Sequence, residues 1–179
     1  MVDDHDVGLL SPFPGAPKEA GTTIPHPGPP SFLSGGTPVP SERVAILIDK
    51  EGQQRDGGRL LKSLNSAQIE SEVVTFHGEC STEEIDRVVE VLQAMATRVD
   101  CVVAVGGGKC LDVGKGVADR LAMPVVNVPT LASTDAPCSA LSVMYTTEGI
   151  FSDVVFYPRS PALVAIDTRI VADAPVRFL

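Results

Sequence analysis

The stretch "CVVAVGGGKCLDVGKGVADRLAMPVVNV" (residues 101–128) decides the fold that we expect for this chain. Its first five residues are all apolar, which is typical of a strand buried on both faces. Residues 109–121 then predict a helix, and the short apolar run at 124–128 predicts a second strand. A strand, a helix and a strand in this order indicate a parallel βαβ unit.

The same alternation precedes this unit along the chain. Residues 42–49 predict a compact apolar strand, residues 56–66 a helix, and residues 69–76 a further strand. Ser81 and Glu84 have the spacing of a capping box, which opens another amphipathic helix directly before the unit.

Two more elements follow the unit. Residues 142–157 predict a β-hairpin that turns at Glu148–Gly149, and residues 162–167 predict one more strand. Strands that alternate with helices and are apolar on both faces predict an α/β fold. We therefore expect a Rossmann-like parallel sheet flanked by helices, with a β-hairpin, within residues 41–179.

Residues 1–40 have a different composition. They hold nine of the 15 prolines and six of the 16 glycines of the 179-residue chain, and they show neither helical nor strand periodicity. Proline removes backbone hydrogen-bond donors and fixes φ, so a packed sheet is difficult to build from such a segment. We expect residues 1–40 to form a disordered leader.

The charge balance excludes two classes of partner. Lysine and arginine number 14 against 23 acidic residues, which gives a formal net charge of −9. Proteins bind nucleic acids by neutralising phosphates, and anionic membranes attract basic segments, so we expect neither partner. Aromatic residues make up 4% of the chain and tryptophan is absent, which also disfavours a base-stacking surface.

Several features together predict a cytoplasmic protein. No apolar run approaches the length of a membrane span. The acidic residues of Met1–Asp6 do not form the basic start of a signal peptide. The four cysteines (Cys80, Cys101, Cys110 and Cys138) are widely spaced and form no CxxC pair, so we expect free thiols and neither a disulfide framework nor a structural zinc site.

A glycine-rich turn, Gly106-Gly107-Gly108-Lys109, joins the strand at 101–105 to the helix that follows. Three glycines let a ligand approach the backbone closely, and the helix N-terminus offers free N–H groups, which suits a pyrophosphate. A tight strand-to-helix turn is the alternative, but one glycine would suffice for it, so the glycine count favours phosphate. The segment fits neither the Walker A pattern nor GxGxxG.

Two other segments at predicted strand ends carry polar side chains. Asp49 ends the strand at 42–49, where an acid commonly accepts hydrogen bonds from a cofactor ribose, although a solvated acid is the simpler interpretation. The loop "PTLASTDAPCS" (129–139) is dense in hydroxyls and has one acid, Asp135. It could wrap a ligand, or its polar residues could simply cap turns, and the residues alone leave both interpretations open.

The chain contains three histidines, His5, His26 and His77. No two of them lie at helical spacing for a metal. A partly exposed structural role is the simplest interpretation of His77, and a Ser-His-Asp arrangement has no support in the sequence.

The strings "GGGKCLDVGKGVAD" and "VPTLASTDAPCSALSVMYTTEG" resemble the glycerol dehydrogenases of the iron-containing alcohol dehydrogenase superfamily. The segments "GECSTEEIDR" and "PALVAIDTRIVADAPVRFL" are similar to that family too, so the resemblance runs from Glu42 to Leu179. The loop string separates the chain from dehydroquinate synthases, which share the glycine-rich turn but not this loop.

The resemblance implies NAD as cofactor and assigns roles by position. Asp49 would bind the adenosine ribose, and Asp135 would hydrogen-bond a polyol substrate. The pyrophosphate turn would comprise Gly107, Gly108, Lys109, Cys110, Leu111 and Asp112, with Cys110 in place of the more usual threonine. The cofactor cleft would be lined by Thr130, Leu131, Ala132 and Ser133, and the nicotinamide side would be flanked by Ser139, Leu141 and Tyr145.

The implied reaction is the oxidation of glycerol by NAD⁺ to dihydroxyacetone, with zinc or iron lowering the pKa of the reacting hydroxyl. Members of the family form homo-oligomers and continue into a helical domain whose Gly-x-Gly-Asp segment and two histidines bind the metal. This sequence contains none of these ligands, so we expect a truncated cofactor-binding half with the C-terminal helical domain missing. The alternatives are a catalytically inactive nucleotide-binding or interaction module, and a phosphate-binding module unrelated to NAD.

Overall fold

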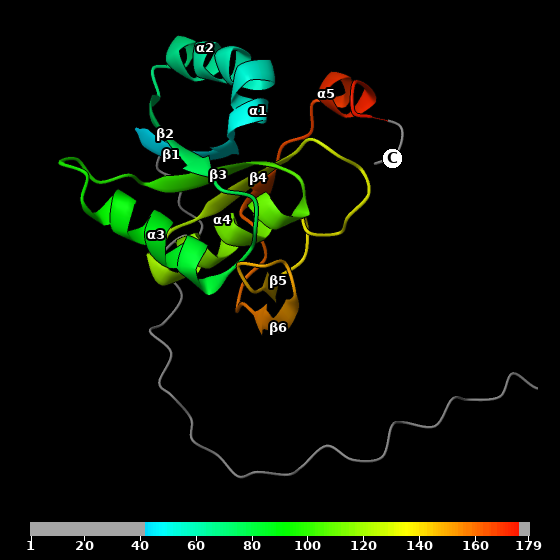
Figure 1. Cartoon of the computed structure of the whole chain (residues 1–179). Helices are drawn as coiled ribbons and strands as arrows, with labels where there is room; N and C mark the ends of the chain where they lie inside the picture. Colours follow the sequence, from blue (N-terminus) through cyan, green and yellow to red (C-terminus); the bar gives the residue numbers. More distant parts are fainter. Residues whose placement is uncertain (1–41, 176–179) are drawn as a thin grey trace, which may run out of the picture. The chain divides into compact units, whose positions relative to one another are not determined.

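The computed structural model describes residues 42–175 of the chain, and the predicted leader at 1–40 lies outside them. Five strands form one parallel sheet in the order β2-β1-β3-β4-β7 (Figure 1). Their bounds are Arg43–Asp49 for β1, Glu70–Phe76 for β2, Cys101–Gly106 for β3, Val125–Pro129 for β4 and Leu163–Val164 for β7. The predicted α/β fold with a parallel sheet is confirmed.

Helices cover both faces of this sheet (Figure 1). One face carries a continuous helical segment made of α1 (Lys50–Gly52), the π-helical η2 (Gln53–Gly57) and α2 (Gly58–Ser66). On the other face lie α3 (Thr82–Gln93) and α4 (Gly108–Arg120). The β-strands alternate their apolar side chains between two cores, one beneath α2 and one beneath α3 and α4.

The helical segment after β1 begins earlier than the predicted helix at 56–66. It starts at Lys50 because the carboxylate of Asp49 caps it, accepting a hydrogen bond of 2.7 Å from the Gly52 N–H. Helix α3 begins where the sequence predicts, since Ser81 Oγ accepts a hydrogen bond from Glu84 N–H. The Glu84 carboxylate, however, accepts from the backbone N–H of His77, so the reciprocal half of the capping box is absent there.

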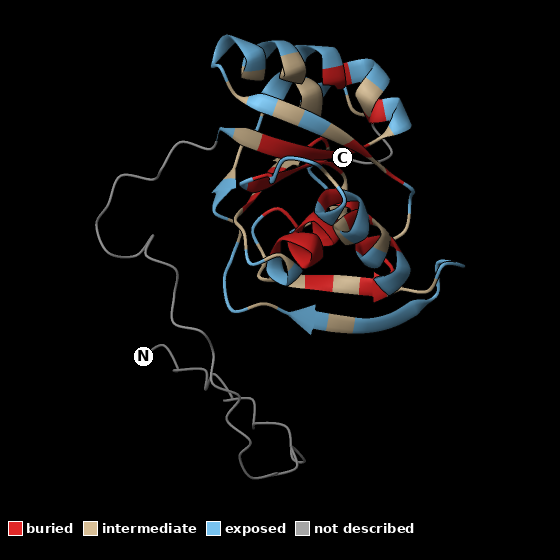
Figure 2. Cartoon of the chain, turned by 90° about the vertical axis from the view of Figure 1, so that its left-hand side faces the viewer, coloured by how far each residue is buried: buried red, intermediate tan, exposed pale blue. Residues whose placement is uncertain are grey.

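The predicted hairpin is confirmed. It consists of β5 (Leu141–Tyr145) and β6 (Phe151–Phe156), which pair antiparallel, and Gly149 in its turn has φ +80°. Met144 of β5 belongs to the core beneath α4. Strand β6 forms the outer layer of the hairpin and is largely exposed (Figure 2).

The predicted strand at 162–167 is wrong over most of its length. Leu163 and Val164 form strand β7, and the N–H groups of Ala162 and Ala165 on either side also donate to β4 carbonyls. Asp167 then caps the short helix α5 (Thr168–Ala172) by accepting a hydrogen bond from Arg169 N–H. An acid that caps a helix ends the extended backbone at that point. Within residues 42–175, no helix is long and apolar enough to cross a membrane.

Candidate functional site

The winding of the sheet reverses between β1 and β3. These neighbouring strands are parallel, with Ile48 opposite Val105 at their carboxyl ends. The chain leaves β1 toward one face of the sheet and leaves β3 toward the other (Figure 1). Such a switch point leaves a crevice in which α/β proteins bind ligands, and Asp49 and the glycine turn lie on its two sides.

The glycine turn opens helix α4 without a side-chain cap. Gly107 is the N-cap residue and offers no side-chain acceptor. The described helices α1, α3 and α5, in contrast, are capped by the side chains of Asp49, Ser81 and Asp167. The first N–H groups of α4 therefore lack the side-chain partner that those helices have, and an external anion could accept their hydrogen bonds.

The loop after β4 packs closely against this turn, so that a Cβ on either of two of its glycines would press on a loop side chain. A Cβ on Gly107 would lie 3.1 Å from Leu131 Cδ1, and a Cβ on Gly108 would lie 3.1 Å from Thr134 Oγ1. The Thr130 N–H donates a hydrogen bond of 3.0 Å to the Gly106 carbonyl. The structure thus brings the predicted turn and the predicted cleft loop together.

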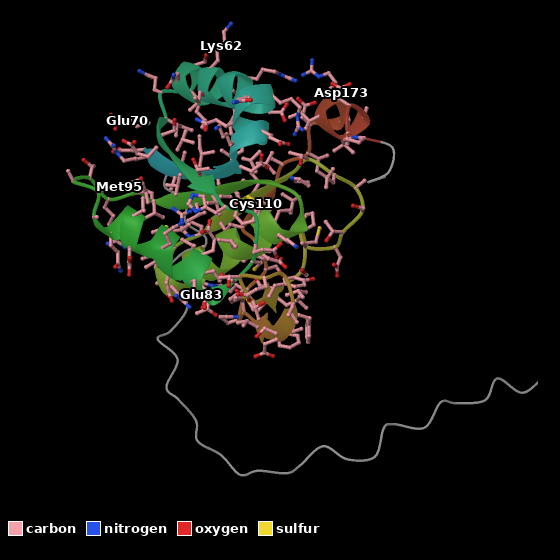
Figure 3. All side chains as sticks on the ribbon, in the orientation of Figure 1. Lys62, Glu70, Glu83, Met95, Cys110 and Asp173 are labelled. Atoms are coloured by element: carbon pink, nitrogen blue, oxygen red, sulfur yellow. The ribbon has the colours of Figure 1, made fainter. Side chains whose placement is uncertain are left out.

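Beyond Lys109, the predicted turn residues face the interior. Cys110 is buried (Figure 3), with Sγ against the carbonyls of Leu47 and Val105, and burial raises the pKa of its thiol far above the usual range. Leu111 packs with Ala104 and Ala136. These two residues could serve a ligand only through their backbone.

Asp112 forms a buried ion pair instead of facing the turn. Its Oδ1 lies 2.8 Å from Lys115 Nζ, and its Oδ2 accepts a hydrogen bond of 2.9 Å from Val143 N–H. Burial raises the pKa of Asp112, while the hydrogen bond from Lys115 acts in the opposite direction. The Asp112 side chain therefore joins α4 to the hairpin.

The side chain of Lys109 is exposed at the start of α4. Its Nζ forms an ion pair of 2.6 Å with Glu79 Oε1 and lies 5.0 Å from the ring centre of Tyr145. Tyr145 in turn makes an edge contact with Phe151. A phosphate near the turn would have to compete with Glu79 for the Lys109 ammonium.

The two carboxylate oxygens of Asp49 differ in their hydrogen bonds. Its Oδ1 caps α1, whereas no donor within residues 42–175 forms a hydrogen bond with its Oδ2. The side chain is half-buried at the end of β1. One oxygen is thus available for a ligand hydroxyl.

A cavity of about 470 Å³ lies on the side of the sheet that carries α2 and α5. Apolar side chains from the carboxyl ends of three neighbouring strands, Ile48, Val105 and Val128, form its floor. Arg59 and Asp167, which form an ion pair of 2.8 Å, lie at its polar side. The apolar floor suits one face of a planar aromatic ring, and polar side chains line the rest of the cavity, namely Asp56, Arg59, Ser63, Asp167 and Arg169.

The loop at 130–140 presents several of its predicted site residues to solvent. Ala132, Ser133 and Asp135 are exposed, and the Asp135 carbonyl accepts hydrogen bonds from the N–H groups of Cys138 and Ser139. Ser139 and Leu141 instead contact Lys115. His77 is exposed, and its Nδ1 lies 3.6 Å from Oε2 of Glu84, a buried residue of α3.

Sequence reasoning missed two buried polar residues beside this loop. Lys115 is 3% exposed. Asn127 of β4 is fully buried, and its Nδ2 donates a hydrogen bond of 3.1 Å to the Pro137 carbonyl. A lysine three residues after an aspartate within a helix between two apolar strands was the available signal. No group of three possible metal-ligating side chains occurs among the residues that the structure describes.

Comparison with known proteins bears on this site. The family model for iron-containing alcohol dehydrogenase matches residues 36–168. Over 139 residues the chain is 47% identical to a glycerol dehydrogenase of Thermotoga maritima, which covers 77% of this chain and 37% of the relative. It is 44% identical over 118 residues to a glycolaldehyde reductase of Halobacterium salinarum, covering 66% of this chain and 32% of that protein.

Solved structures show the same fold. The crystal structure of glycerol dehydrogenase from Schizosaccharomyces pombe superposes with a TM-score of 0.66 at 36% identity, covering 76% of this chain and 34% of that one. The chain spans about a third of the length of the curated relatives it matches.

Proposed function

Because the chain belongs to the iron-containing alcohol dehydrogenase family, we propose that it binds NAD across the switch point as the cofactor-binding part of a glycerol dehydrogenase. The uncapped, glycine-lined start of α4 beside β1 is the observation that carries this proposal. Three ligand-binding regions surround that point, and each suits one part of the dinucleotide.

The pyrophosphate would bind at the turn. The backbone N–H groups of Gly108 and Lys109 would donate to its oxygens, and the positive end of the α4 dipole would favour its charge. The glycines matter because a Cβ on Gly107 or Gly108 would push Leu131 or Thr134 of the loop aside. Breaking the ion pair with Glu79 would free the Lys109 ammonium for a phosphate oxygen.

The adenosine would lie on the other side of the switch point. Asp49 Oδ2 would accept hydrogen bonds from the ribose hydroxyls, as an acid at a strand end does in dinucleotide-binding folds. The cavity beyond Ile48 would receive the adenine ring on its apolar floor. The same carboxylate would repel a 2′-phosphate, so this arrangement favours NAD over NADP.

The nicotinamide would lie along the loop and the hairpin, near Ser139, Leu141 and Tyr145. Bound NAD⁺ supplies the acceptor for a hydride. Asp135, exposed on the same loop, would hydrogen-bond a polyol hydroxyl. The residues 42–175 present no set of three ligands for zinc or iron, so the proposal places no metal in this part of the chain.

A titration of the whole chain with NADH, followed by nicotinamide fluorescence, tests cofactor binding. Asp49→Asn keeps an N-cap acceptor for α1 but removes the carboxylate, so we expect NADH affinity to fall about tenfold, one charge-assisted hydrogen bond. NADPH affinity should fall less. Asp153→Asn, an exposed change on β6, is the matched control and should leave both affinities unchanged. Equal NADH affinity in Asp49→Asn and the parent chain would contradict the proposal.

Glycerol is the proposed substrate, and its test is separate. Glycerol should tighten NAD⁺ binding if both occupy one site, because the loop at 130–140 would contact both. Asp135→Asn should remove that effect while NADH binding stays unchanged. A stronger effect from glycolaldehyde than from glycerol would favour the activity named for the Halobacterium salinarum relative.

A further inference from the structure

Lys115 is a buried cation surrounded by oxygen atoms. Its side chain is 3% exposed in the middle of α4, where all residues from Cys110 to Ala118 are buried. The Nζ atom lies 2.8 Å from Asp112 Oδ1. It also donates to the Ala136 carbonyl at 3.0 Å, to the Ser139 carbonyl at 3.3 Å, to Ser139 Oγ at 3.2 Å, and to the Leu141 carbonyl.

Most of these acceptors belong to the loop between β4 and β5. Residues 131–140 form no helix or strand, and no backbone N–H within residues 42–175 donates to the carbonyls of Ala136 and Ser139. A buried carbonyl without a donor is costly, and an ammonium group forms stronger hydrogen bonds than a neutral donor. Lys115 therefore holds the carbonyls of Ser139 and Leu141 in place and shares the Ala136 carbonyl with Asn127 Nδ2.

The ion pair reaches the hairpin as well. Asp112 accepts from the Val143 N–H through Oδ2, and its backbone carbonyl accepts from Ser142 Oγ at 2.8 Å. Both Asp112 and Lys115 stand on the helix that begins at the glycine turn. The pair thus fixes the loop and the start of β5 relative to the first turn of α4.

We propose that Lys115, paired with Asp112, is the positioning residue that sets the nicotinamide-side loop against the pyrophosphate turn. This inference rests on the proposed function, since it assigns the loop to the nicotinamide and the turn to the pyrophosphate. Lys115 touches neither cofactor half itself, because its donors are engaged with the loop. Its contribution is to orient the segment that carries Asp135, Ser139 and Leu141.

A positioning role and a merely structural role predict different ligand binding. ADP-ribose would contact Asp49, the cavity and the backbone N–H groups of Gly108 and Lys109, and Lys115 Nζ forms no hydrogen bond with any of these. NADH would contact the loop in addition. Loss of Lys115 should therefore weaken the binding of NADH but not that of ADP-ribose. General destabilisation of the domain would instead weaken the binding of both ligands to the same extent.

The test compares both affinities in the full chain and in Lys115→Met. We expect the dissociation constant for NADH to rise about tenfold, the equivalent of one charge-assisted hydrogen bond, and that for ADP-ribose to change less than twofold. Lys62→Met is the matched control, since Lys62 is exposed on α2 and points away from the loop (Figure 3). It should leave both constants unchanged. Equal losses of affinity for NADH and ADP-ribose, or unchanged affinity for both, would overturn the proposal.

A second variant covers the case in which Lys115→Met fails to fold, because it leaves the Asp112 carboxylate buried without a partner. Asp112→Asn with Lys115→Met removes both charges and keeps an acceptor for Val143 N–H. We expect the same selective loss of affinity for NADH. Hydrogen exchange of the amides at 136–143 should rise relative to that of β3 in either variant. If the parent chain bound neither ligand, the proposed function would fail, and unchanged exchange in the loop would separately refute the positioning role.

Discussion

Lys109 and Glu79 form an ion pair at the first turn of α4, with Nζ 2.6 Å from Oε1 and 2.8 Å from Oε2. The lysine expected to meet a phosphate is therefore already partnered. Glu79 comes from the segment between β2 and α3, so the pair joins that segment to the glycine turn. A phosphate at the turn would have to displace the Glu79 carboxylate, because both are anions that would pair with the Lys109 ammonium.

Removal of that carboxylate should strengthen phosphate binding. In Glu79→Gln the Lys109 ammonium is free, and one negative charge near the site is gone, so we expect ADP-ribose to bind about two- to fivefold more tightly. The gain should shrink at high salt, because both side chains are partly exposed. Calorimetric titration measures both effects.

Glu83→Gln is the control for this change, because Glu83 is exposed in the first turn of α3. It removes the same charge from the chain without touching Lys109. Equal gains in the two variants would mean that net charge, and not the pair with Glu79, governs the affinity.

Replacement by alanine should have opposite effects on stability at two helical glycines. A Cβ on Gly114 would lie 2.4 Å from the Ala104 Cβ, where α4 rests on β3. Gly114→Ala should lower the free energy of unfolding by about 1–3 kcal/mol, because both backbones must move apart. A Cβ on Gly58 would meet nothing within 4 Å, and its φ of −63° is helical, so Gly58→Ala should stabilise the chain by about 0.5–1 kcal/mol. Urea unfolding measures both, and a stable Gly114→Ala variant would contradict the close packing of α4 on β3.

The four thiols should differ sharply in reactivity. Cys80, Cys101 and Cys110 are buried, whereas Cys138 is exposed on the loop before β5. A thiol reagent should modify one cysteine rapidly in the native chain and all four in denaturant. Cys138→Ser should abolish the rapid phase of thiol modification in the native chain. Since Cys138 lies on the proposed nicotinamide-side loop, saturating NADH should slow that phase, and rapid modification of two or more native thiols would refute the burial described above.

Stability should fall in alkaline solution. Burial raises the pKa of Cys80 to about 12 and that of Cys101 to about 11, from an ordinary 9.0. Above pH 9 the unfolded chain releases these protons while the folded chain retains them. The stabilisation is therefore complete below pH 9 and is lost as pH rises toward 11–12, at about 1.4 kcal/mol per thiol per pH unit.

Urea unfolding at pH 8 and pH 10.5 measures this loss. Cys101→Val removes one of the titrating thiols and should show a smaller fall between the two pH values than the parent chain. An equal fall in both proteins would assign the alkaline loss to other groups.

Much of the fold is determined by local patterns in the sequence. Apolar runs such as that of β3 predict buried parallel strands, because a strand covered on both faces has no polar side to present. The glycine turn and the Ser81 cap are equally local, since each depends on the conformation of a few adjacent residues. Their positions at the ends of predicted strands placed Asp49, the turn and the loop at one edge of the sheet, and the resemblance to a family assigned their roles.

Tertiary structure alone decided which way the polar side chains face. Within "GKCLDVGKG", Asp112 three residues before Lys115 is the one local signal that separates this lysine, buried beneath the loop, from Lys109, exposed beside Glu79, and an aspartate at that spacing does not by itself bury a lysine. That distinction depends on segments about 20–30 positions away along the chain, whose carbonyls and carboxylates reach these lysines only after the sheet and hairpin have assembled. Burial of a charge is favourable only where such distant partners converge, so the sequence determined the strands, the turns and the caps, and the packing decided the ion pairs that hold the site together.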